Sequence, residues 1–307
     1  AAQLNLNEAI NLAVIPQNPN KRLADNAATS ASLHAARTRL AQLWLAKNPQ
    51  DAAQLDALAL SISFKNRKQL AFAAPHLVEY VLQHVQGNII QTALDLPMQQ
   101  TLERVLTKYV QSRRDVGINN ASALLIDSTT MQVKALVGSA DYHDATIAGQ
   151  VNGVLGKRSP GSTLKPFIYA LALDQGLIHS ASILKDAPSN FGVFTPENFD
   201  GRFNGPISAQ DALIRSRNIP AVSLAAKLSK PSLYDFLKLA QVQKLQSEQH
   251  YGLALVLGGG EVTMEELAQL YAILPNHGEW RELEYLKSNH LNQKPLQLLS
   301  DEAAYIV

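Results

Sequence analysis

Apolar residues recur at helical spacing near the N-terminus and through most of the second half of the chain. Such spacing is typical of helices that bury one face. Pro16 and the segment NPQD (48–51) interrupt the first two runs, as proline does when it stops a helix. The predicted helices cover residues 9–14, 30–48, 98–111, 163–175, 208–215, 220–228, 232–240 and 263–274.

Two short apolar segments, ASALLID (121–127) and MQVKALVG (131–138), are predicted to pair as strands, because turn-forming residues separate them. NIIQTALD (88–95) also has strand character. A strand pair followed by a block of helices predicts an α+β domain with an antiparallel sheet and a helical lobe.

A length of 307 residues predicts about two domains. The two helices within 1–48 are too small to enclose a core alone, so we interpret them as the end of a domain. Residues 49–86 are predicted to be a linker that contains a short helical run, the polar stretch FKNRKQ and AAPHLVEYVL. The second predicted domain covers 87–307.

The composition of the chain excludes several classes of function. Hydrophobic residues make up 46% of the chain, and the net charge of +1 provides no electrostatic footprint for nucleic acid. Cysteine is absent, which excludes disulfides, thiolate metal sites and a cysteine nucleophile. The histidines lack metal-binding spacing, so no metal site is predicted from them. No apolar run approaches the roughly 18 residues that span a bilayer, and AAQLNLNEAI lacks signal-peptide features.

The segment KRSPGSTLKPF (157–167) carries the first candidate chemistry. Pro166 is tolerated only near the start of a helix, so this helix is predicted to begin close to Ser162, after a tight turn at Gly161. Lys165 then lies three residues after Ser162 on the same face. A buried lysine near other cations loses its proton more easily and could activate the serine as a nucleophile. Alternatively, Ser162 caps the helix and Lys165 is a solvated surface residue.

The second candidate is SRN (216–218), between two predicted helices, with Pro220 suited to the start of the second. Taken alone, it is equally a polar capping loop. Asn198 and Asp200 in TPENFDG either border a substrate groove or serve turn chemistry. Gly258, Gly259 and Gly260 fit no phosphate-loop motif and indicate a tight turn.

The order S-x-x-K then S-x-N is that of penicillin-binding proteins and serine β-lactamases. Four longer segments resemble the transpeptidase domain of class A (bifunctional) penicillin-binding proteins: GKRSPGSTLKPFIYALALDQG, FTPENFDGRFNGPIS, ALIRSRNIPAVSLA and GGGEVTMEELAQLYAILPNHG. AAPHLVEYVL and QVNGVLGKRSPGS are most similar to the 1C type. LNLNEAINLAVIPQNPN resembles the end of the same proteins' glycosyltransferase domain. The resemblance covers essentially the whole chain.

The resemblance implies a penicillin-binding transpeptidase fold, with Ser162 as nucleophile and Lys165 as the group that activates it. Ser216 is expected to relay a proton to the leaving amine, and Asn218 to hydrogen-bond the donor peptide. The backbone N–H of Ser162 would form half of an oxyanion hole. Arg217 occupies a position that varies in the family and receives no role.

The implied reaction is acyl transfer from the D-Ala-D-Ala end of a peptidoglycan stem peptide to a neighbouring stem peptide, without a cofactor. β-Lactams would acylate the same serine. The whole protein would also polymerise glycan strands from lipid II at the periplasmic face of the inner membrane, with a membrane anchor upstream of this chain. Other cell-wall synthesis proteins are possible partners.

One feature of the family pattern is missing, because no K-T-G or K-S-G occurs in the 307 residues. DEAAYIV at the end of the chain resembles a helix cut off midway, so we expect the natural protein to continue and to supply this motif. Two other functions stay open: a D,D-carboxypeptidase or β-lactamase-like hydrolase, and a penicillin-binding scaffold without turnover.

Overall fold

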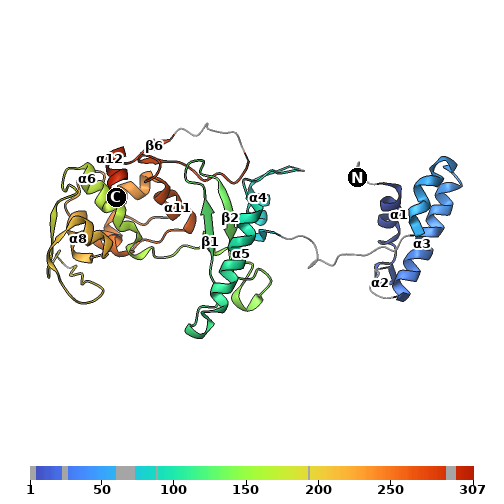
Figure 1. Ribbon diagram of the computed structural model, residues 1–307, viewed down its shortest axis with the longest axis horizontal. Coiled ribbons are helices and arrows are strands. Elements are labelled where there is room, and N and C mark those ends of the chain that lie inside the picture. Colours follow the sequence, from blue (N-terminus) through green and yellow to red (C-terminus); the bar gives the residue numbers. More distant parts are fainter. Residues whose placement is uncertain (1–4, 23–26, 60–72, 88, 193, 288–294) are drawn as a thin grey trace. The chain divides into compact units, whose positions relative to one another are not determined.

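The computed structural model describes residues 5–22, 27–59, 73–87, 89–192, 194–287 and 295–307 (Figure 1). The chain forms two compact units, Ala1–Phe72 and Ala73–Val307. No helix in the described ranges combines the length and the apolar character needed to cross a bilayer.

The first unit is helical, and its elements are α1 (Leu6–Val14), α2 (Pro19–Arg22), α3 (Ala27–Leu45) and the 3₁₀ helix η1 (Pro49–Ala59). The Asn5 side chain accepts a hydrogen bond from the N–H of Glu8, and the Glu8 carboxylate accepts one from the N–H of Asn5. This capping box explains where α1 begins. A small core forms around Ile10 and Ala41, and both helices predicted in this region are confirmed.

The predicted linker, residues 49–86, differs from the structure at both of its ends. η1 contacts α1 and α3 within the first unit. α4 (Pro75–His84) belongs to the second unit, because Leu77 and Val81 are buried there against Val133 and Leu136. The polar stretch FKNRKQ lies outside the described residues.

In its described residues, the second unit contains mainly short helices and three two-stranded antiparallel sheets. After α4 its α-helices are α5 (Leu96–Gln111), α6 (Lys165–Asp174), α7 (Ala209–Ile214), α8 (Asn218–Ala225), α9 (Leu233–Leu239), α10 (Glu248–Tyr251), α11 (Met264–Ala272) and α12 (Asp301–Ile306). Its strands are β1 (Ala123–Ile126), β2 (Val133–Val137), β3 (Ile183–Asp186), β4 (Gly205–Ser208), β5 (Glu279–Trp280) and β6 (Leu296–Gln297). Its 3₁₀ helices are η3 (Arg114–Val116), η4 (Ala145–Ile147), η5 (Gly153–Leu155), η6 (Gly161–Leu164) and η7 (Gly252–Leu257).

The predicted strand pair is confirmed as β1 and β2, with Ala123 opposite Val137. Helices α4 and α5 contact β2, and α11 contacts β1. The strand predicted over 88–95 is wrong, since only an isolated bridge from Thr92 to Leu286 forms in its described part. The N–H groups of Ala93 and Asp95 donate to Tyr285 and Lys134 respectively, so this segment divides its hydrogen bonds between two neighbours. A continuous ladder with one partner does not form.

The helical lobe is built around α6. Phe167, Ile168, Ala170 and Leu171 are all buried, so this helix is surrounded by protein. The ring of Phe167 stacks on that of Phe236 with centroids 5.4 Å apart. Deleting such a buried ring typically costs about 3–5 kcal/mol. The helices predicted beyond residue 157 are all confirmed as α6, α7, α8, α9 and α11, and the α+β fold class is confirmed with them.

Candidate active site

The turn that carries Ser162 is η6, which continues directly into α6. Gly161 has a φ of 54°, a left-handed conformation that favours glycine. Pro166 lies in the first turn of α6, so the predicted helix start is confirmed. The N–H of Lys165 donates to the carbonyl of Ser162 and closes a 3₁₀ turn. Residues i and i+3 eclipse in such a turn, which places both side chains on one side.

Gly258 packs closely against the backbone of Gly161 in this turn. It has a φ of 94° at the end of η7, and a Cβ there would lie 2.5 Å from the nitrogen of Gly161. The hydroxyl of Ser159 donates to the carbonyl of Gly258 at 2.7 Å. The predicted glycine turn is therefore confirmed, and it also lets η7 approach the backbone beside Ser162.

Lys165 is the centre of the site. The residue is 1% exposed, although it carries an ammonium group. Its Nζ donates to the carbonyl and the hydroxyl of Ser216 at 2.6 and 3.1 Å, and to Oδ1 of Asn218 at 2.7 Å. No carboxylate in the described ranges lies within 4 Å of this nitrogen. The alternative of a solvated surface lysine is wrong.

This environment lowers the pKa of Lys165 from 10.5 to about 8. Burial contributes most, because it disfavours the charged form, and the positive charge of Arg217 adds to it. At neutral pH a measurable fraction of the amine is unprotonated and can accept a proton.

Ser216 reaches Lys165 from the connection between α7 and α8, and Asn218 does so from the first position of α8. Ser216 has a φ of 54°, a conformation that costs a non-glycine residue about 1–2 kcal/mol. Oδ1 of Asn218 accepts from Lys165, and its Nδ2 donates to the carbonyl of Glu197 at 2.6 Å. The structure thus joins three of the four predicted residues by hydrogen bonds.

Ser162 is exposed and lies one 3₁₀ turn before Lys165. Among the described residues, no hydrogen bond joins its hydroxyl to Nζ of Lys165. Catalytic hydrogen bonds are often long in a free enzyme and shorten once substrate is bound. The structure therefore has an exposed serine three residues before a buried amine whose hydrogen-bond acceptors are neutral.

The sequence interpretation missed Arg217 and Asp186. Both are buried and paired, with Nε of Arg217 donating to Oδ2 of Asp186 at 2.8 Å. The two residues are 31 positions apart, and no spacing rule connects them. The only local signal was the accumulation of Asn and Asp in TPENFDG, whose Asp200 also binds Arg217.

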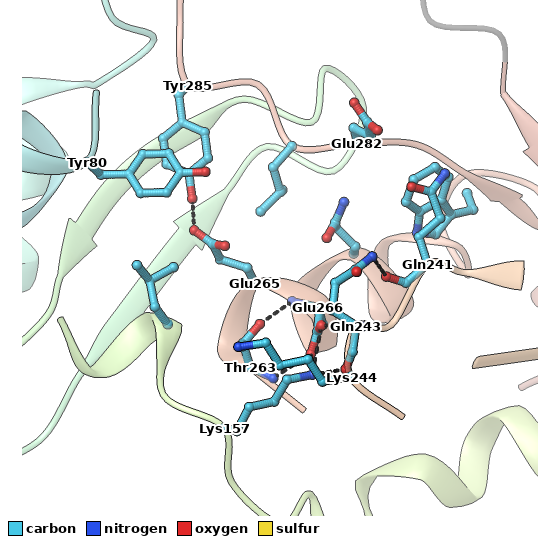
Figure 2. A pocket seen from close by; sticks show the side chains of 14 residues that line it. Tyr80, Lys157, Gln241, Gln243, Lys244, Thr263, Glu265, Glu266, Glu282 and Tyr285 are labelled. Atoms are coloured by element: carbon cyan, nitrogen blue, oxygen red, sulfur yellow. Dashed lines mark hydrogen bonds and ion pairs between the residues drawn. The ribbon is translucent and has the colours of Figure 1, made fainter. Parts of the chain in front are cut away.

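A polar hollow of about 430 Å³ lies beside Lys157, and none of the four predicted residues lines it. Figure 2 shows Lys157 against Glu266, and Tyr285 against Glu265. Nζ of Lys157 lies 2.7 Å from the Glu266 carboxylate. Burial raises the pKa of Glu265. The described residues contain no group of three His, Asp or Glu side chains that could hold a metal ion.

Comparisons with known proteins agree with this geometry. The family model for the penicillin-binding protein transpeptidase domain matches residues 121–300. Penicillin-binding protein 1C of Escherichia coli is 33% identical over all of this chain, and penicillin-binding protein 1A of Neisseria cinerea is 32% identical over 57% of it. The chain spans only 39% and 21% of the lengths of these two relatives.

Solved structures show the same fold. The penicillin-binding protein PonA1 of Mycobacterium tuberculosis is similar over 76% of this chain and 68% of its own, with a TM-score of 0.59 and 18% identity. A structure of that protein in complex with penicillin V has a TM-score of 0.60. The family model spans more than half of the chain and contains the whole Lys165 cluster, so this chain belongs to the penicillin-binding protein transpeptidase family.

Proposed function

We propose that this chain carries the serine D,D-transpeptidase site of a class A (bifunctional) peptidoglycan synthase. The observation that carries the proposal is the buried Lys165 amine. It lies three residues after an exposed serine and hydrogen-bonds only to neutral oxygens among the described residues. Support also comes from the family model and from the 1C and 1A relatives.

The first half of the proposed reaction forms the acyl-enzyme. Oγ of Ser162 attacks the carbonyl carbon of the D-Ala-D-Ala bond, and its proton passes to the neutral Nζ of Lys165. The backbone N–H of Ser162 stabilises the oxyanion as one donor of the oxyanion hole. The C–N bond then breaks. The departing amine receives the proton from Lys165 through the hydroxyl of Ser216, which lies 3.1 Å from Nζ.

The second half transfers the acyl group. An amine of a neighbouring stem peptide attacks the ester carbonyl of Ser162, and its proton returns to Oγ through Lys165. Asn218 binds the backbone of the donor peptide through an Nδ2 hydrogen that the bond to Glu197 leaves free, since an amide nitrogen carries two hydrogens. A β-lactam resembles the donor and would form the same ester. Its strained amide takes the place of the D-Ala-D-Ala bond.

The remaining expectations concern the whole protein. We propose that residues 1–48 end a glycosyltransferase domain, that the transpeptidase domain extends beyond residue 307, and that the K-T-G motif lies there. The protein would then act on lipid II-derived glycan strands and stem peptides at the periplasmic face of the inner membrane.

Covalent labelling of the full-length protein by a fluorescent penicillin tests the nucleophile. We expect Ser162→Ala to reduce the labelled band to background, because alanine has no hydroxyl that could form the acyl ester. The control is Ser180→Ala, an exposed serine beyond the end of α6, which should label like the unmodified protein. Equal labelling of Ser162→Ala would refute the assignment.

Two further measurements separate the alternative functions. A β-lactamase would release the fluorescent acyl group rapidly, whereas a transpeptidase keeps it for many minutes or longer. A scaffold would be labelled but would form no cross-linked product from natural stem peptides. Formation of cross-linked product together with a long-lived acyl-enzyme supports the proposed reaction.

A further inference from the structure

The side chain of Arg217 points away from Lys165, although its two neighbours bind that lysine. Arg217 has extended backbone angles, φ −64° and ψ 132°, between the left-handed Ser216 and the first residue of α8. Ser216 and Asn218 contact Nζ of Lys165, whereas the guanidinium of Arg217 binds Asp186, and Arg217 as a whole is only 7% exposed.

All three guanidinium nitrogens of Arg217 donate hydrogen bonds. Nε donates to Oδ2 of Asp186 at 2.8 Å, Nη1 donates to the carboxylate of Asp200 at 3.0 and 3.1 Å, and Nη2 donates to the carbonyl of Arg202. Asp186, at the end of β3, is completely buried. A planar fork that binds two carboxylates and a carbonyl has a single orientation, which a lysine could not reproduce.

The same acceptors bind the loop 197–202. Oδ1 of Asp186 accepts from Nδ2 of Asn198 at 2.7 Å, and that nitrogen also donates to the carbonyl of Arg202 at 2.9 Å. Oδ1 of Asn198 in turn accepts from the backbone N–H of Asn218 at 2.8 Å. The loop 197–202 therefore hydrogen-bonds twice to Asn218, which contacts Lys165. One bond is to Oδ1 of Asn198, and the other is to the carbonyl of Glu197.

These hydrogen bonds stabilise a backbone conformation of Ser216 that is otherwise unfavourable. Ser216 is held in the left-handed region, which persists in proteins only where the surroundings over-determine it. Arg217 follows it directly and is anchored on β3 and on the loop 197–202. Removing that anchor frees Ser216 to relax, and the Ser216 hydroxyl would then leave Nζ of Lys165.

We propose that Arg217 is a positioning residue for the acyl transfer, which ties the Ser216–Asn218 segment to Asp186 and to the loop 197–202 and so keeps both acceptors on Lys165. The inference rests on the proposed function. It assigns no contact between Arg217 and substrate.

The positive charge of Arg217 also affects the pKa of Lys165, so the pH dependence of acylation is a second measurement of its role. The charged and titratable groups around Lys165 are Arg217, the carboxylates of Asp186 and Asp200 bound to it, Glu197 in the adjoining loop, and Tyr169 one turn along α6. Desolvation opposes the charge of Arg217, but the hydrogen bonds that it donates to Asp200 and Asp186 raise its pKa, so it stays charged. Removing this cation raises the pKa of Lys165, since its charge helps to lower that pKa.

The experiment measures the rate of penicillin acylation against pH for three variants of the full-length protein. Arg217→Lys keeps the charge but loses the fork. We expect acylation to slow by about 10- to 100-fold, the loss that small misplacements of catalytic groups produce, with an unchanged pH midpoint. Arg217→Gln with Asp186→Asn removes the charge and leaves no unpaired carboxylate in the interior. It should show the same loss with a higher midpoint. Arg215→Gln, at an exposed position two residues earlier, is the control and should match the unmodified protein.

A normal rate and midpoint in either folded Arg217 variant would overturn the inference. So would loss of folding in both, judged by circular dichroism, because Arg217 would then have a purely structural role. Neither outcome affects the proposed function, which depends on whether Ser162→Ala loses the label. Normal labelling of Ser162→Ala would refute the proposed function, whatever result the Arg217 variants give.

Discussion

Lys157 and Lys165 lie eight positions apart in one segment, and their surroundings are opposite. Nζ of Lys157 lies 2.7 Å from the Glu266 carboxylate and also donates to the carbonyl of Gln243 at 2.6 Å (Figure 2). Nζ of Lys165 meets a hydroxyl, a carbonyl and an amide oxygen, with the charge of Arg217 nearby. Both amines are fully occupied by hydrogen bonds, yet only Lys157 has a counter-charge.

The difference shows how a fold gives two lysines of one segment opposite electrostatic surroundings. An opposite charge favours the ammonium form, and neutral acceptors in a buried site do so far less. Glu266 also accepts from the N–H groups of Gln243 and Thr263, so the Lys157 pair joins α11 to two loops. Lys165 binds three uncharged oxygens and has a pKa of about 8, which suits proton transfer near neutral pH.

The largest effect should follow from removing each amine in turn. We expect Lys165→Met to slow penicillin acylation by about 10²- to 10⁴-fold, the usual contribution of a general base. Lys157→Met should leave the acylation rate of the folded protein unchanged and lower its thermal stability. Stopped-flow acylation and thermal unfolding of both variants check this. The comparison fails if the two variants lose similar amounts of activity.

A smaller effect should follow from giving Lys165 the counter-charge that Lys157 has. Asn218→Asp places a carboxylate where Oδ1 of Asn218 lies 2.7 Å from Nζ. A close opposite charge raises the pKa of Lys165 by about 1–3 units, so acylation at pH 7 should fall by about 10- to 10³-fold. In the unmodified protein the rate should rise tenfold per pH unit up to about pH 8 and then level off, because the neutral amine is the active form.

In Asn218→Asp the plateau should move to higher pH, and alkaline buffer should restore part of the rate. Asn218→Ala is the matched control, because it removes the acceptor without adding charge, so its loss should persist at every pH. A pH profile of Asn218→Asp with its midpoint unmoved would contradict the electrostatic account.

The smallest effect on chemistry is expected at Glu266. Glu266→Gln leaves the Lys157 ammonium without its counter-charge and should lower the free energy of unfolding by about 1–3 kcal/mol. Acylation per folded molecule should not change. Glu261→Gln, at an exposed neighbour, is the control and should unfold at the original temperature. A slower acylation rate in folded Glu266→Gln would mean that the two lysine sites are coupled.

Much of this protein follows from local sequence. Pro166 after Ser162 restricts where α6 can begin, and Gly161 permits the turn before it, so the turn that carries Ser162 was predictable from steric rules alone. The helices beyond residue 157 and the β1–β2 pair follow from hydrophobic periodicity, because burial of one face imposes that pattern. The predicted strand at 88–95 failed because its hydrogen-bond partners, Tyr285 and Lys134, come from distant segments.

Only the tertiary structure determines which of the two lysines has a carboxylate beside it. Lys157 and Lys165 have the same intrinsic chemistry, and each could have been solvated, paired or buried. Glu266 lies 109 positions after Lys157, and Asn218 lies 53 positions after Lys165. Periodicity reports which face of an element is buried but not which groups of other elements meet there. The pairing of Arg217 with Asp186 depends on such a meeting, so only the folded chain reveals it.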